Sequence, residues 1–153
     1  MMATQLLRQQ HRHIEQGLAL LEEQSDDCES EFEALVVELT AHLAAEMDVF
    51  YRAAEAALGQ PLAEQRRHHE HLHKAVSRAE RASGEPASFP RRLFDLAETF
   101  KAHARLEERA IHPSIEGLMG QQELEVLGTH VAAFQAAVAS ALRSAGRPSP
   151  SKA

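Results

Sequence analysis

At 153 residues the chain has the length of a single domain, and its formal net charge of -7, with no run of basic residues, argues against a nucleic-acid-binding surface. A single cysteine excludes an internal disulfide framework, and the N-terminal segment lacks the apolar stretch of a signal peptide, so we expect a cytoplasmic protein. Since no uninterrupted apolar run approaches the roughly 20 residues of a membrane span, we expect no membrane partner either.

Glycine and proline residues divide the chain into five long segments with helical periodicity. We predict helices over residues 4–24, 29–58, 62–82, 91–116 and 121–144. Pro113 falls inside the fourth segment and should kink or end that helix. Period-two runs of β-branched residues, which would indicate strands, are not evident.

A weak internal repeat relates the first helix to the third and the second to the fourth. The string AHLAAEMDVFYR at 41–52 corresponds to AHARLEERAIHP at 102–113. Duplicated helix pairs with short loops favour an all-α, up-down-up-down four-helix bundle, here with an additional C-terminal helix. The predicted domain covers residues 1–144, and residues 145–153 are expected to form a disordered tail.

The first predicted helix has a histidine at a core position. The inward-facing series advances by alternating steps of four and three through Leu7, His11, Ile14, Leu18 and Leu21. His11 is therefore expected to point into the bundle.

The second and fourth helices each place a His and a Glu, one turn apart, on the same inward face. The second series reads Phe32, Leu35, Leu39, His42, Glu46, Val49, Ala53, and the fourth reads Leu93, Leu96, Phe100, His103, Glu107, Ala110. In the fourth helix Glu108, at i+5, is the alternative to Glu107 if the helix is locally distorted. Tyr51 is expected at the rim with its hydroxyl in water.

The third helix offers several histidines in the string RRHHEHLHKAV. His69 matches the position of His11 in the repeat, and His73 lies one turn later on the same side, so both are predicted to face inward. His68 remains an alternative partner for His69, whereas His71 points away. His13, His112 and His130 are expected at the surface or at helix ends.

The same string matches H-E-x-x-H, a zinc-protease motif. That mechanism needs an open metal cleft beside a peptide-binding sheet edge, and a chain without strands does not provide one. The protease would also leave the buried residues of the second and fourth helices unexplained.

Buried carboxylates are costly unless a cation compensates them. Two inward glutamates opposite several imidazoles therefore indicate a metal site inside the bundle. The predicted ligands are His11, His42, Glu46, His69, His73, His103 and Glu107. A set rich in nitrogen with two carboxylates favours iron, with zinc or manganese as alternatives.

These residues and their spacing resemble the hemerythrin-like, or HHE cation-binding, domain, over roughly residues 5–142. The resemblance implies two iron ions bridged by two carboxylates, which would be Glu46 and Glu107. By the same match, His11 and His42 would hold one iron, and the remaining histidines, His69, His73 and His103, would hold the other.

The expected function is that of a non-haem di-iron protein that binds oxygen or a related small diatomic or peroxide ligand, for carriage or for oxygen, redox or nitric oxide sensing. An enzyme that consumes oxygen, peroxide or nitric oxide at the same centre is the main alternative. Iron storage or donation is a further one.

Overall fold

The computed structural model describes residues 1–24 and 27–146, and within these residues all regular structure is helical. In chain order the elements are α1 (Ala3–Glu23), α2 (Glu29–Ala45), η1 (Glu46–Phe50), α3 (Tyr51–Leu58), α4 (Ala63–Ala82), α5 (Phe89–Leu106), η2 (Glu107–Ile111), α6 (His112–Leu118) and α7 (Gln121–Ala145). The predicted second helix is thus α2, η1 and α3 in succession, and the predicted fourth is α5, η2 and α6.

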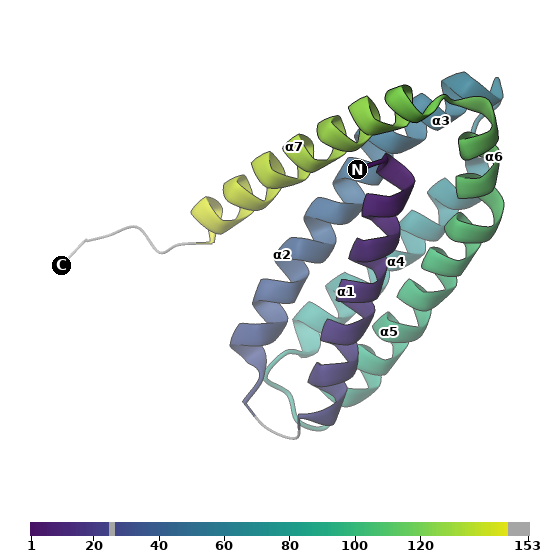
Figure 1. Cartoon of the computed structure of the whole chain (residues 1–153). Coiled ribbons are helices and arrows are strands. Elements are labelled where there is room, and N and C mark those ends of the chain that lie inside the picture. Colours follow the sequence, from purple (N-terminus) through teal and green to yellow (C-terminus); the bar gives the residue numbers. More distant parts are fainter. Residues whose placement is uncertain (25–26, 147–153) are drawn as a thin grey trace.

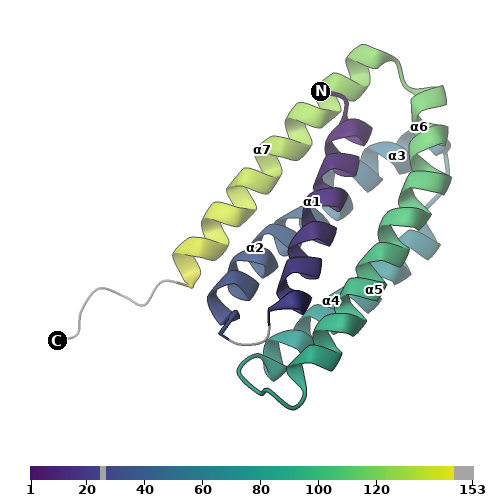
Figure 2. The ribbon, with the colours of Figure 1, turned by 60° about the horizontal axis from the view of Figure 1, so that its bottom comes forward.

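The predicted up-down-up-down bundle with an additional C-terminal helix is confirmed (Figures 1 and 2). The α4 helix packs against α5, and α1 packs against α5 and α2. The α7 helix then returns across α1 and α2, so a fifth helix covers one face of the bundle (Figure 1). Residues 147–153, most of the predicted tail, lie outside the described residues.

Local signals account for several helix ends. Gly59 closes α3 in the left-handed conformation, with φ of 70°, which is typical of a helix C-terminus. Pro90 and Pro113 each lie in the first turn of a helix, where the missing N–H has no intrahelical partner to lose. The fourth predicted helix was expected to kink or end at Pro113, but its α-helical part already ends at Leu106, where the π turn η2 begins, and Pro113 lies inside α6.

The interior consists of two apolar clusters with a polar layer between them. The first cluster includes Ile14, Leu18, Leu39, Leu72 and Phe100, near the α1–α2 and α4–α5 connections. The second includes Leu7, Phe50, Ile111 and Ile115, towards the other end of the bundle. Between the two clusters, the inward positions of α1 and of the segment from α5 into η2 are occupied by histidine and glutamate. The polar layer therefore has apolar packing on both sides.

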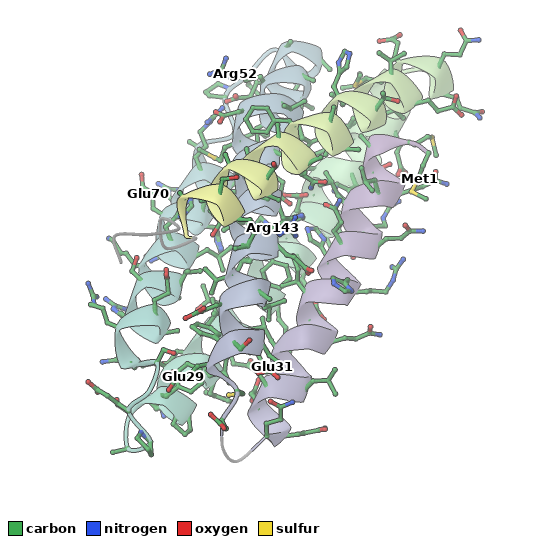
Figure 3. The ribbon with its side chains drawn as sticks, turned by 90° about the vertical axis from the view of Figure 1, so that its left-hand side faces the viewer. Met1, Glu29, Glu31, Arg52, Glu70 and Arg143 are labelled. Carbon is green, nitrogen blue, oxygen red and sulfur yellow. The ribbon has the colours of Figure 1, made fainter. Side chains whose placement is uncertain are left out.

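The α7 helix is apolar along most of its length but only partly covered. Leu124, Leu127 and Val131 in its first half are buried, whereas Phe134 and Val138 in its second half are only partly buried. By length and composition alone it could cross a membrane, with a mean hydropathy of 1.2 over an 18-residue window of which 22% is buried. In this fold the first half serves as a core helix, and the second half crosses the α2 face (Figure 3).

Candidate metal centre

The structure brings six of the seven predicted ligands together in the polar layer. The group consists of His11, His42, Glu46, His69, His103 and Glu107, each at most 2% exposed. Their ligand atoms form two overlapping sets, and within each set all the atoms lie within 4.8 Å of one another. His11 and His42 belong to one set, His69 and Glu107 to the other, and Glu46 and His103 to both.

Glu46 is at the centre of this arrangement, and each of its oxygens faces a pair of imidazoles. Oε1 lies 3.1 Å from Nε2 of His11 and 2.7 Å from Nε2 of His42. Oε2 lies 2.9 Å from Nε2 of His69 and 3.0 Å from Nε2 of His103. One carboxylate thus connects two pairs of nitrogen donors, which is the disposition of a bridging ligand.

These distances suit neighbouring ligands of a metal ion. Two donors at about 2.1 Å from an ion and at right angles to each other are about 3.0 Å apart. Several of the atoms involved have no hydrogen-bond partner although they are fully buried, namely Nε2 of His42, Oε2 of Glu46 and Nε2 of His103. Buried polar atoms are rarely left without a partner. The residues therefore fit a bound cation better than a hydrogen-bonded cluster.

Glu107 divides its oxygens between the same two halves. Oε1 lies 3.1 Å from Nε2 of His112 and 3.8 Å from Nε2 of His11. Oε2 accepts a hydrogen bond of 2.8 Å from the hydroxyl of Tyr51 and lies 3.7 Å from Nε2 of His103. Glu46 and Glu107, which occupy equivalent positions in the sequence repeat, therefore each direct one oxygen to either half of the cluster.

The structure corrects the predictions for Tyr51 and His112. Both side chains are fully buried, so Tyr51 is not a rim residue and His112 is neither a surface nor a cap residue. The hydroxyl of Tyr51 also lies 3.0 Å from Nε2 of His69. Together they add a phenol to one half of the centre and a fifth buried imidazole to the other.

A π-helical turn explains both corrections. The η1 and η2 segments begin at the two central glutamates, and the N–H groups of Tyr51 and His112 donate to the carbonyls of Glu46 and Glu107, five residues earlier. Each turn inserts one residue relative to an α-helix and so rotates everything after it. In an undistorted α-helix, i+5 would point about 140° away.

His73 does not join the cluster. Its side chain is exposed, and its ring lies 6.4 Å from that of His69. The part of the ring that packs against the helix is desolvated, which lowers its pKa, and the neighbouring His69 lowers the pKa further. His71 is exposed as expected, and His68 is half-buried. Because His71 and His73 are exposed and only His69 among the histidines of the H-E-x-x-H string points inward, the string does not form a zinc-protease site.

Glu108 is not in the centre but contacts it from outside. Its carboxylate is 33% exposed and lies 2.8 Å from Nδ1 of His11. This hydrogen bond lowers the pKa of Glu108. A carboxylate behind a histidine fixes which ring nitrogen carries the proton and leaves the other free for a metal. Glu107, not Glu108, is the inward carboxylate.

The electrostatics of the metal-free cluster centre on the two glutamates. Burial and the neighbouring His42 and His103 act in opposite directions on Glu46, and the net effect holds its pKa well below the usual range. Burial lowers the pKa of His11, but hydrogen bonds that its ring donates to Glu108 and Glu46 outweigh burial and raise the pKa to about 10. Without a metal, protonated histidines therefore compensate the buried carboxylates.

Comparison with protein families supplies independent evidence. Residues 2–115 match the model of the hemerythrin HHE cation-binding domain. The chain belongs to this family, and its buried clusters of histidine and glutamate fit a metal-cation site. No curated protein and no solved structure matches the chain.

Proposed function

We propose that this protein is a non-haem di-iron protein that binds oxygen, or a related small ligand such as nitric oxide or peroxide, between the helices of the bundle. The observation that carries this proposal is the position of Glu46, whose two oxygens each face two imidazole nitrogens. A single metal ion would use only one of these oxygens and one pair of histidines.

The donors support two ions with similar surroundings. One half contains Nε2 of His11, His42 and His112, and the other contains Nε2 of His69 and His103 with the hydroxyl of Tyr51. Each half also has one oxygen of Glu46 and one of Glu107. The first half thus offers five side-chain donors and the second offers four, because the hydroxyl of Tyr51 donates to Glu107. Both numbers are below the six that an octahedral ion takes, so positions are left for a shared or exogenous ligand.

Bound iron would supply the redox chemistry and the attachment point for the small ligand. The protein's own contribution is to keep the centre dry and to fix the donors. Apolar clusters lie on both sides of it, with Phe100 and Ile14 on one side and Leu7 and Phe50 on the other. Excluding water strengthens the electrostatic interactions inside and slows leakage of protons.

Anaerobic reconstitution with ferrous iron, followed by optical spectra before and after addition of oxygen, tests the proposal. We expect a reproducible spectral change with oxygen that reverses when oxygen is removed. An irreversible change with turnover of the added ligand would favour the enzyme, and binding of zinc or manganese in preference to iron would contradict the di-iron assignment.

One observation favours the second candidate, an enzyme that consumes oxygen, peroxide or nitric oxide. The phenol of Tyr51 is buried inside the centre and donates to Glu107. Burial, followed by the charges of Glu107 and Glu46, raises the pKa of Tyr51 well above its usual value, so the group stays protonated and can donate. If the protein is an enzyme, replacing Tyr51 with Phe should slow peroxide turnover by more than it weakens iron binding.

A further inference from the structure

The imidazole of His42 is held from behind by a glutamine. Nδ1–H of His42 donates to Oε1 of Gln10 over 2.9 Å. This contact keeps a proton on Nδ1, so Nε2, which lies 2.7 Å from Oε1 of Glu46, is the ring nitrogen available to a metal ion. Gln10 therefore does for His42 what Glu108 does for His11.

Gln10 is in turn held by a residue of α7. Nε2 of Gln10 donates to Oε1 of Gln135 over 2.6 Å, and Nε2 of Gln135 donates to Oε1 of Gln10 over 2.5 Å. The two amides form a reciprocal pair. Oε1 of Gln10 thus accepts from both His42 and Gln135, which uses both of its lone pairs.

The difference between a carboxylate and an amide gives Gln135 its importance. A carboxylate such as Glu108 only accepts hydrogen bonds, so either of its orientations favours the same histidine tautomer. The amide of Gln10 can also turn its NH₂ group towards His42, which would place the ring proton on Nε2 and remove that nitrogen from the donor set. The reciprocal pair with Gln135 fixes the orientation that leaves Nε2 free.

The contact depends on how α7 lies on the bundle. Gln135 lies beyond residues 2–115, which match the family model. Beside the amide pair, a groove of about 360 Å³ separates this part of α7 from the bundle, and alanines 132, 136 and 139 line its α7 side. Because the α7 side chains here are small and the groove is open, little packing holds His42 from this direction. The hydrogen bonds through Gln10 are therefore the direct connection between His42 and α7.

We propose that Gln135 is a positioning residue of the metal centre, which acts through Gln10 to hold His42 in the tautomer that binds metal. The α7 helix is then part of the site and not merely a cover. This inference rests on the proposed function for its metal-binding consequence, but the tautomer of His42 is a property of the metal-free protein.

Two measurements on the full chain test the proposal. The first is the pair of ¹⁵N chemical shifts of the His42 ring in metal-free protein, which distinguish a proton on Nδ1 from one on Nε2. The second is the affinity for Zn²⁺ by competition with a chromophoric chelator. We compare the parent with Gln135→Ala, and Gln122→Ala is the matched control because it makes the same change at an exposed site on the same helix.

In the parent and in Gln122→Ala we expect Nδ1 of His42 to carry a proton in all molecules. In Gln135→Ala we expect a fraction of molecules in which Nδ1 of His42 carries no proton, because the amide of Gln10 can turn. We also expect a loss of Zn²⁺ affinity of about tenfold or more, the size seen when the hydrogen-bond partner of a ligand is removed. Adding Gln10→Glu to Gln135→Ala should restore both, because a carboxylate cannot present a donor to His42.

Parent-like shifts and affinity in Gln135→Ala would overturn the proposal. A loss that Gln10→Glu does not restore would also overturn it, since that result would mean that α7 acts through packing alone. If the parent binds no metal, the proposed function fails, whereas the comparison of tautomers still decides the role of Gln135.

Discussion

Glu46→Gln is the most informative single substitution, because it keeps the volume of the side chain and removes only its charge and one acceptor atom. Glu46 is fully buried and lies within 3.1 Å of four imidazole nitrogens. An amide presents an oxygen to one pair of histidines and an NH₂ group to the other. Only one pair then retains an acceptor, which is neutral, and no bridge between two ions remains.

Two magnitudes follow. Removing one partner of a buried ion pair typically costs about 3–5 kcal/mol, and the low end applies because glutamine can still accept from one pair of histidines. For a domain with a typical unfolding free energy of about 5–15 kcal/mol, the metal-free variant should stay folded. Metal content, in contrast, should fall from about two ions per chain to one or fewer.

Urea denaturation of the metal-free protein and elemental analysis after reconstitution measure these effects. Glu38→Gln is the matched control, since Glu38 lies on α2, which leads into the turn that carries Glu46, and among the described residues its ion-pair partner is the exposed His13. Its unfolding free energy should stay within about 0.5 kcal/mol of the parent, and its metal content should not change. Two ions bound with parent affinity in Glu46→Gln would refute the bridging role of Glu46.

Three further predictions concern the rest of the site. His112→Ala should lower metal content or affinity, because Nε2 of His112 lies 3.1 Å from Oε1 of Glu107. His73→Ala changes an exposed residue and should bind metal like the parent. Competition with a chelator measures the metal affinity of both variants. Tyr51→Phe should lower the unfolding free energy of the metal-free protein by about 1–2 kcal/mol in urea titrations, because Oε2 of the buried Glu107 loses its hydrogen-bond donor. An unchanged free energy would mean that the Tyr51 hydroxyl contributes nothing to stability. The pKa of His11 is raised from 6.5 to about 10, so protonation of His11 stabilises the metal-free protein fully below about pH 6.5. This stabilisation is lost as the pH rises through 10. A metal ion that binds His11 competes with this proton. Metal binding at pH 7 should therefore release protons, detectable with a pH indicator in weak buffer, and no release would contradict the protonated state of His11.

The sequence predicted the bundle and the inward faces of its helices well, up to a definable point. Spacing of three and four residues correctly placed His11, His42, Glu46, His103 and Glu107 in the interior. Beyond each glutamate the same spacing failed.

After the π turns, the buried positions move on by one residue. Phe50 and Ala54 are buried in place of the expected Val49 and Ala53, and Ile111 takes the place of Ala110. A π turn has no strong sequence preference of its own, so α-helical periodicity could not reveal it. The parallel strings around Glu46 and Glu107 were the available signal, because they place Tyr51 and His112 at equivalent positions.

In the third predicted helix, the prediction that His73 faces inward was wrong for a different reason. Its buried face advances from His69 to Leu72 and then to Val76, so a step of three follows His69. His73, a step of four, falls beside that face and remains in contact with water. From any inward position of a helix, the next inward residue can lie three or four positions later. Because this helix is so polar, the pattern of hydrophobic residues does not show which of the two it is.

The hydrogen bonds behind the ligands were out of reach of sequence reasoning. Gln135 contacts Gln10 across 125 positions in the chain, and nothing in the local pattern of either residue marks it. Such contacts depend on how α7 crosses the bundle, which is a tertiary property.

The measurement that tests the central claim most directly is the iron content of the protein after anaerobic loading with ferrous iron and removal of excess metal. Because Glu46 and Glu107 each direct their two oxygens to opposite halves of the centre, we expect two iron ions per chain. A reproducible value of one or none would contradict it.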